Sequence, residues 1–156
     1  MPERGSRYSD GKGKKKYSHH INSETNLHVY GVNLQTKDGS CVRDFIHVED
    51  IAAAHLKAAQ RLLSSSLTGA EAYNLSNGDG YSVLEVVEAC RRITGQPIFY
   101  RLENSRLGDP HILIGNSENA KSVLGWTCAI SGLDEIVASA WRWVLKNNTS
   151  NAKNRV

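Results

Sequence analysis

From Leu27 onward, short segments with strand periodicity alternate with longer segments of helical periodicity, and this alternation constrains the fold more than any other feature. The expected strands are 27–31, 45–48, 72–75, 97–101 and 111–114. The expected helices begin at Glu49, Ser82, Ser117 and Ser131. Strands that alternate with helices are typical of α/β proteins, so we predict that fold class.

The helix that begins at Ser82 has the clearest boundaries. Ser82 and Glu85 have the spacing of a capping box, and Gly95 is a typical helix stop. The other two long helices are predicted from apolar residues that share one face. In the helix after Glu49 the shared face is Ile51, His55, Ala58 and Leu62, and in the last helix the expected buried stripe is Ile136, Val137, Ala140, Trp141 and Val144.

Charge divides the chain into a domain and two tails. The chain has 156 residues and a net charge of +3, which is enough length for one domain. Residues 1–26 hold six Lys or Arg against three acids and lack periodicity, so this segment alone accounts for the excess charge. We expect 1–26 to be a disordered basic tail, 27–147 the folded domain, and 148–156 a second disordered tail.

Several classes of function are excluded or disfavoured. The chain has no long apolar run and no apolar N-terminal segment, so we expect neither a membrane partner nor secretion. Cys41, Cys90 and Cys128 are odd in number and widely spaced, which is typical of reduced thiols in a cytoplasmic protein. The lysine run at 12–16 lacks interleaved aromatic residues and P-loop spacing, so we expect no nucleic-acid partner. His19 and His20 lack ligand-spaced partners and are expected to be ordinary polar residues rather than metal ligands.

Two arginines stand beside turns that contain glycine. Arg43 follows Gly39 and precedes an apolar segment, and Arg106 lies three residues before Asp109 across Gly108. One interpretation is a site in which two guanidinium groups hold a diphosphate and the carboxylate accepts hydrogen bonds from ribose hydroxyls. The alternative is structural: Arg43 pairs with Asp44 or another acid, Asp109 caps its turn, and Arg106 faces solvent.

A family resemblance bears on this choice. The segments LHVYG, DGSCVRDFIHVEDIAAAHLKA, YNLSNGDGYSVLEVVEACRRITG, RLGDP and LGW follow one another at 27–126. In this order and spacing they resemble the C-terminal part of the UDP-glucose 4-epimerases, which are extended short-chain dehydrogenases/reductases of the NAD-dependent epimerase/dehydratase family. The resemblance covers about residues 27–147 and leaves 1–26 without a counterpart. It implies the fold of the C-terminal substrate-binding lobe of such an enzyme.

The resemblance also implies roles for four residues. Tyr30 matches the aromatic position beside the uracil, and Arg43 and Arg106 match arginines that bind the diphosphate. Asp109 matches the carboxylate on the uridine ribose. The implied ligand is a UDP-sugar. Leu113, Asn116 and Asn119 depart from the residues more usual in the family, while His47 and His55 are expected to pack and hydrogen-bond rather than to act in chemistry.

The chemistry of the resembled family needs a cofactor-binding loop that this sequence does not show. Those enzymes are isomerases of galactose metabolism that pass a hydride to NAD and back, which requires a Gly-rich Rossmann loop and a Tyr-x-x-x-Lys pair. No Gly-rich loop of this kind follows an expected strand. Tyr8 and Lys12 have the Tyr-x-x-x-Lys spacing, but they lie in the segment 1–26 that is expected to be a disordered tail. We therefore expect the Rossmann cofactor half, with its NAD loop, to be missing, and no catalysis by this chain alone.

Alternatives stay open for the role of the chain and for its partners. One is half of a split epimerase whose partner chain binds NAD. The other is a non-catalytic UDP-sugar-binding or interaction module. Apolar surface left by the missing half also makes a homo-oligomer a third expectation about partners.

Overall fold

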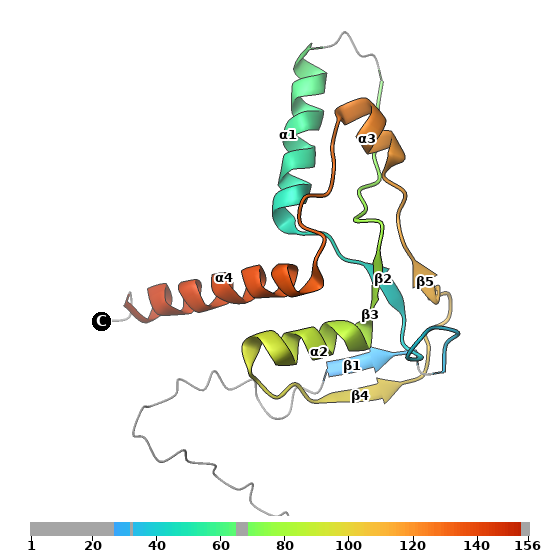
Figure 1. The fold of residues 1–156 in the computed structure, drawn as a ribbon, viewed down its shortest axis with the longest axis vertical. Helices are drawn as coiled ribbons and strands as arrows, with labels where there is room; N and C mark the ends of the chain where they lie inside the picture. Colours follow the sequence, from blue (N-terminus) through green and yellow to red (C-terminus); the bar gives the residue numbers. More distant parts are fainter. Residues whose placement is uncertain (1–26, 32, 65–68, 154–156) are drawn as a thin grey trace, which may run out of the picture.

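The computed structural model describes residues 27–31, 33–64 and 69–153. The expectations for 1–26, including those for His19 and His20, lie outside the described residues. The elements alternate as the sequence predicts, so the α/β class is confirmed (Figure 1). In chain order they are β1 (Leu27–Tyr30), β2 (Val42–Asp44), α1 (Val48–Ser64), β3 (Gly80–Ser82), α2 (Val83–Thr94), β4 (Tyr100–Glu103), β5 (Ile112–Leu113), α3 (Glu118–Leu124) and α4 (Leu133–Lys153).

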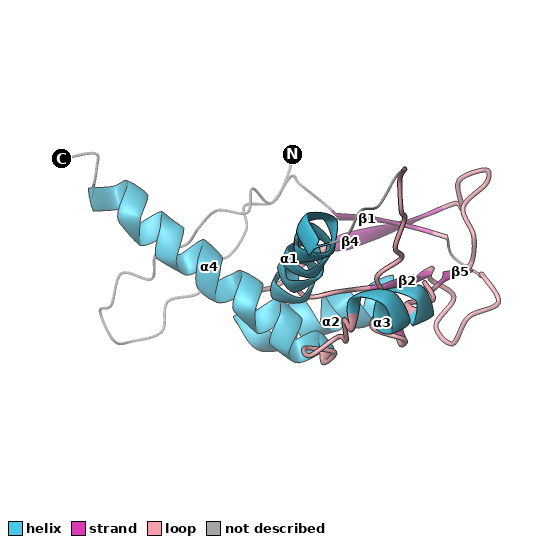
Figure 2. Ribbon diagram, turned by 90° about the horizontal axis from the view of Figure 1, so that it is seen from above, coloured by secondary structure: helices cyan, strands magenta, loops and turns pink. Residues whose placement is uncertain are grey.

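The described strands form two small sheets. In the first, β1 pairs with β4 in parallel, with Leu27 opposite Tyr100. In the second, β2 lies in the middle, antiparallel to β3 and parallel to β5. Helix α1 lies beside α3 toward one end of the structure, and α2 lies beside α4 nearer the other end (Figure 1). The second view shows α4 running outward beyond the strands (Figure 2).

The core around α1 and α3 is built on Trp126. Its side chain is only 1% exposed and packs with Ala54 of α1 and Ala120 of α3. The indole Nε1–H donates to the carbonyl of Asp50 at 2.8 Å, so the polar group of this large side chain is satisfied. Trp126 therefore joins α1 and α3 to the segment that leads into α4.

Asp50 provides a second link in the same place. Its carboxylate accepts hydrogen bonds from the backbone N–H groups of Ala129 at 3.0 Å and Ile130 at 2.9 Å, and from the Cys128 thiol at 3.4 Å. Burial acts to raise the pKa of Asp50, but these hydrogen bonds outweigh it and leave the pKa below its usual value. The sequence indicates Asp50 only as an acid near a helix N-terminus, whereas in the structure its side chain is buried and hydrogen-bonded.

The start of α2 is as predicted. The Ser82 hydroxyl accepts from the N–H of Glu85 at 3.1 Å, and the Glu85 carboxylate accepts from the N–H of Ser82 at 2.8 Å. Gly95 ends the helix in the left-handed region, at φ 65°. The Ser82 hydroxyl also donates to Asp38, which ties the helix start to the turn before β2.

Replacing Ser82 with alanine should lower the free energy of unfolding by about 2 kcal/mol, because the cap and the partner of Asp38 are lost together. Urea denaturation followed by circular dichroism measures this. Ser131→Ala is the matched control, since Ser131 is exposed and its hydroxyl makes no hydrogen bond with a described residue. Equal stability of the two variants would contradict the prediction.

The start of the last helix differs from the sequence-based expectation. The sequence predicts that Ser131 opens this helix, whereas α4 begins two residues later, at Leu133. The N–H groups of Glu135 and Ile136 donate to the carbonyl of Gly132, so the first turn closes on Gly132 rather than on the serine.

The strands nearest to β2 differ from the prediction. The strand expected at 45–48 lies at Val42–Asp44, because β3 and β5 pair with those residues and the chain turns into α1 at Val48. The strand expected at 72–75 is not formed, since Gly80–Ser82 provides the pairing with β2 instead.

The two remaining strand predictions are closer. The strand expected at 97–101 is shifted to Tyr100–Glu103, the residues that pair with β1. The strand expected at 111–114 is present but shorter, at Ile112–Leu113, because only this part of the segment pairs with β2.

The buried face of α1 is narrower than predicted. Its buried residues are Asp50 and Ala54, while His55 is exposed and Leu62 is 65% exposed. Ala54 packs with Trp126 and with Ala120 of α3, while the core cluster of the described residues includes no side chain from the last turns of α1.

Helix α4 also differs from the expectation. Its predicted stripe is only half-buried, and Ala140 is exposed, because α4 extends beyond its packing partner α2 (Figure 1). The helix continues to Lys153, so the disordered tail expected from residue 148 is wrong for 148–153. Helix propagation adds one hydrogen bond per residue and outweighs the low propensity of the Asn and Thr residues there.

Candidate functional site

The four candidate residues come from three separate segments and lie in one contact chain. Tyr30 ends β1, Arg43 is the central residue of β2, and Arg106 and Asp109 lie in the loop between β4 and β5. The Arg106 guanidinium carbon is 4.7 Å from the centre of the Tyr30 ring, and Arg106 Nε donates to Asp109 Oδ2 at 2.8 Å. Asp109 Oδ1 lies 3.9 Å from Arg43 NH2. The structure thus brings all four together.

Arg43 is held by backbone carbonyls. Its NH1 donates to the carbonyl of Val42 at 2.8 Å and to that of Pro110 at 2.9 Å. Within the described part of the chain, its Nε and NH2 have no hydrogen-bond acceptor, and NH2 has only the long ion pair with Asp109. The side chain is 25% exposed. One edge of the guanidinium is therefore fixed, and the other is available to an anion.

The alternative in which Arg43 pairs with the adjacent Asp44 is wrong. The Asp44 carboxylate does not pair with Arg43 but accepts the backbone N–H groups of Asn77 and Gly115. Neighbouring residues of a strand point to opposite faces, which explains why these two side chains do not meet. The acid beside Arg43 is Asp109.

Arg106 and Asp109 occupy a tight turn. The N–H of Asp109 donates to the carbonyl of Arg106 at 3.2 Å, and Gly108 between them has φ 86°, a conformation that favours glycine. The Arg106 side chain is 62% exposed, while that of Asp109 is 24% exposed. Arg106 therefore both faces solvent and covers the Tyr30 ring, as a cation over an aromatic face.

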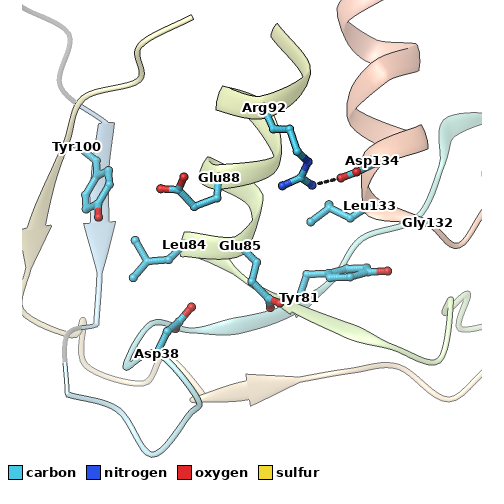
Figure 3. Close-up of a pocket in the computed structure, with 10 residues that line it drawn as sticks. All are labelled: Asp38, Tyr81, Leu84, Glu85, Glu88, Arg92, Tyr100, Gly132, Leu133 and Asp134. Atoms are coloured by element: carbon cyan, nitrogen blue, oxygen red, sulfur yellow. Dashed lines mark hydrogen bonds and ion pairs between the residues drawn. The ribbon is translucent and has the colours of Figure 1, made fainter. Parts of the chain in front are cut away.

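A large hollow of the described surface lies elsewhere. This groove of about 670 Å³ runs between α2, α4 and the residues around Tyr100 (Figure 3). Among its lining side chains are one arginine, Arg92, which pairs with Asp134, and four acids, Asp38, Glu85, Glu88 and Asp134. Burial acts to raise the pKa values of Asp38 and Glu85, but hydrogen bonds leave both pKa values below their usual range, so both carboxyls are charged at neutral pH. An acidic groove disfavours phosphate, so charge favours the Arg43 cluster over this hollow.

Sequence reasoning missed the groups that hold the site in place. The carbonyl of Pro110 binds Arg43, and the carboxylate of Asp44 binds the segment that follows β5. A carbonyl group has no sequence signature. The sequence suggests Asp44 only as a partner for Arg43. Its position beside an arginine, at the start of an apolar segment, is the one sequence feature that could have indicated its supporting role.

His47 and His55, which are expected to have structural roles, both have hydrogen-bond partners. His47 Nδ1 accepts from the N–H of Glu49 at 3.1 Å, and its Nε2 lies 2.7 Å from the Ser139 hydroxyl. Because that hydroxyl donates to the carbonyl of Ile136, the Nε2 of His47 carries the proton and donates. His55 Nδ1 lies 2.8 Å from the carbonyl of Ile51. These contacts agree with the structural roles expected for them.

The three departures from the resembled pattern lie near β5 and α3. Leu113 is 56% exposed. The Asn116 side chain accepts from the N–H of Glu118 at 2.8 Å and so caps α3, a role that the sequence predicts for Ser117, whose side chain makes no cap hydrogen bond. Asn119 donates to the carbonyl of Ala72 at 3.2 Å. Asn116 therefore provides a neutral cap.

The described residues offer neither a metal site nor a membrane-spanning helix. They contain no group of three or more His, Cys, Asp or Glu side chains arranged to hold a metal ion. None of their helices combines the length and the apolar character needed to cross a membrane. Cys41, Cys90 and Cys128 are free, as predicted.

Comparison with known proteins gives relatives that agree on one family. Residues 5–76 match the model of the NAD dependent epimerase/dehydratase family. The chain is 46% identical over 121 residues to the UDP-glucose 4-epimerase of Bacillus subtilis, covering 78% of this chain and 35% of that protein. It is 45% identical over 115 residues to that of Halalkalibacterium halodurans, covering 74% and 34%.

A solved structure is also similar. The UDP-glucose 4-epimerase of Bifidobacterium longum, in complex with NAD+ and UDP, superposes with a TM-score of 0.71 at 35% identity, covering 82% of this chain and 37% of that one. The chain thus spans about a third of the length of the curated relatives that it matches. The family match begins at residue 5, inside the segment expected to have no counterpart. These matches support placing the chain in the NAD-dependent epimerase/dehydratase family.

Proposed function

We propose that this chain binds the UDP part of a UDP-sugar and forms the substrate-binding part of a UDP-glucose 4-epimerase-like protein. The observation that carries the proposal is the contact chain from Tyr30 through Arg106 and Asp109 to Arg43. Three segments far apart in sequence supply an aromatic face, two guanidinium groups and one carboxylate. These are the groups that a base, a diphosphate and a ribose require.

The chemistry of each contact follows from its surroundings. The free edge of Arg43 offers two N–H groups to a phosphate, and its other edge is fixed by the carbonyls of Val42 and Pro110. Because the guanidinium is held before the ligand arrives, little side-chain entropy is lost on binding. Asp109 accepts from Arg106 in the structure and would accept from ribose hydroxyls in the complex, with Arg106 then turning to the second phosphate.

The described residues do not fit NAD. A dinucleotide needs a strand, a glycine-rich turn and a helix N-terminus whose N–H groups face the pyrophosphate. All four described helices carry Glu or Asp in the first turn, and the start of α2 is already occupied by its capping box. We therefore propose that NAD is bound by a partner region rather than by this chain alone, and that the hydride-transfer chemistry of the family depends on that region.

The exposed face of α1 favours a partner region of this kind. Leu56 is 61% exposed and Leu63 is 90% exposed, and because they are seven positions apart they lie on one face of α1. Apolar side chains gathered on one helix indicate a contact surface rather than a solvated one. We propose that the NAD-binding region packs on this face. This chain would then be one half of a split epimerase, which is the second candidate function. The other alternative is a non-catalytic UDP-sugar-binding module.

Calorimetric titration of the chain with UDP, UDP-glucose and NAD tests the proposal. We expect UDP and UDP-glucose to bind and NAD to give no heat of binding. Absence of UDP binding to a chain whose circular dichroism shows folded helices would overturn the substrate-binding role. Binding of NAD would overturn the claim that its site lies elsewhere.

A further inference from the structure

We propose that Asp44 is a positioning residue that sets the geometry of Arg43, the phosphate-binding residue, through the carbonyl of Pro110, an inference that rests on the proposed function. Asp44 ends β2, one residue after Arg43. Successive residues of a strand point to opposite faces, so Asp44 does not share the face that Arg43 presents. Its effect on the ligand must therefore pass through the backbone.

The Asp44 carboxylate joins three segments. Oδ1 accepts from the N–H of Asn77 at 3.2 Å, and Oδ2 accepts from the N–H of Gly115 at 3.1 Å. Asn77 in turn donates through its side chain to the carbonyl of Phe45 at 3.0 Å and to that of Ser131 at 3.3 Å. The end of β2, the turn before β3 and the segment after β5 are thus held at one carboxylate.

The link to Gly115 is the one that reaches the site. The strand β5 pairs in parallel with β2, with Leu113 opposite Arg43, and the N–H of Val42 donates to the carbonyl of His111 at 2.8 Å. Pro110, whose carbonyl holds Arg43, immediately precedes this paired segment, and Asp109 precedes Pro110. Because β5 has only two residues, its pairing with β2 is short. The hydrogen bond from the N–H of Gly115 to Asp44 adds one more contact between these two segments. Asp44 thereby fixes where the Pro110 carbonyl, which holds Arg43, lies relative to β2.

Gly115 leaves room for this contact. A Cβ at Gly115 would lie 3.2 Å from the Ser76 Cβ and 3.5 Å from Asp44 Oδ2. The first distance is tighter than an ordinary contact and would push the backbone of Gly115 away from the carboxylate. Substitution of either Asp44 or Gly115 should therefore weaken this contact and shift the position of Arg43.

The test is Asp44→Asn, which keeps the shape of the side chain but offers only one acceptor oxygen to two N–H donors. We expect its dissociation constant for UDP to rise about tenfold, the effect of losing one charge-assisted hydrogen bond. Uridine, which lacks the phosphates that Arg43 binds, should bind the variant as it binds the parent chain. In the Arg43→Gln background the same change should have less than about a twofold effect, because the two residues act through one contact.

The matched control is Asp79→Asn, in the same turn as Asn77. Asp79 is exposed, and its carboxylate makes no hydrogen bond with a described residue. Should Asp44→Asn fail to fold, Gly115→Ala provides the second variant, with an expected weakening of about three- to fivefold for UDP alone. Circular dichroism and the midpoint of thermal unfolding establish that each variant is folded.

The outcomes separate this inference from the proposed function. If the parent chain binds no UDP, the proposed function fails and the role of Asp44 falls with it. If the parent chain binds UDP and Asp44→Asn binds it equally well, only the role of Asp44 is wrong. Equal losses for UDP and uridine, undiminished in the Arg43→Gln background, would show a general structural effect and would also overturn it.

Discussion

Arg43→Gln is expected to raise the dissociation constant for UDP about a hundredfold while leaving the fold intact. The guanidinium offers a fixed pair of donors to the phosphate, and two charge-assisted hydrogen bonds are worth about 3 kcal/mol. Glutamine keeps a polar side chain but carries no charge. Calorimetric titration at a stated salt concentration measures the change, since screening weakens exposed charge pairs.

Arg101→Gln is the matched control for this experiment. Arg101 is an exposed arginine on β4, opposite His28 of β1, and it makes no ion pair with a described residue. The control removes the same charge from the same protein and should change the affinity by less than about twofold. If both variants weaken UDP binding equally, the effect is one of net charge, and the specific role of Arg43 is wrong.

Asp50→Asn is expected to lower the free energy of unfolding by about 3 kcal/mol, the range for breaking a buried charged hydrogen-bond network. The asparagine amide retains one acceptor oxygen, so at least one of the N–H groups of Ala129 and Ile130 loses its partner. Urea denaturation followed by circular dichroism measures the change. Glu49→Gln is the matched control, because Glu49 is the neighbouring acid and is exposed. A loss no larger than in the control would contradict the anchoring role.

The same carboxylate predicts how stability depends on pH. The pKa of Asp50 is lower in the folded chain than the usual value of about 3.9 for an unfolded chain, so the unfolded state binds the proton more readily at acidic pH. Its contribution to stability is therefore complete above about pH 5 and is lost as the pH falls through the folded pKa. Unfolding free energies measured from about pH 6 to about pH 3 should fall less steeply for Asp50→Asn than for the parent chain. Parallel curves would contradict this.

Local chemistry made part of the fold predictable. The start and end of α2 depend on Ser82, Glu85 and Gly95, which lie within or beside one helix, and the structure has them as predicted. Strand pairing could not be predicted in the same way. Whether β3 or the segment 72–75 pairs with β2 depends on residues far away in the chain. The anchoring of Asp50 by Ala129 and Ile130 is equally distant, and backbone N–H groups leave no pattern in the sequence.

The candidate site was predictable from side chains and from resemblance, but not its supports. Arg43, Arg106 and Asp109 carry charges beside glycine turns, and the structure places them in contact. Which acid Arg43 meets does not follow from adjacency, because strand geometry turns Asp44 to the other face. Tyr30 came from the resemblance alone, and its contact with Arg106 is a finding of the structure.

Main-chain carbonyls hold Arg43, and this determines which sequence changes the site can tolerate. Because the oxygens of Val42 and Pro110 do the holding, substitutions of those two side chains leave the acceptors in place. The number of residues between Asp109 and β5 matters far more, since one insertion would move the Pro110 oxygen by a full residue spacing of about 3.8 Å. The position of the Arg43 guanidinium therefore depends on the length of this loop rather than on which side chains Val42 and Pro110 carry.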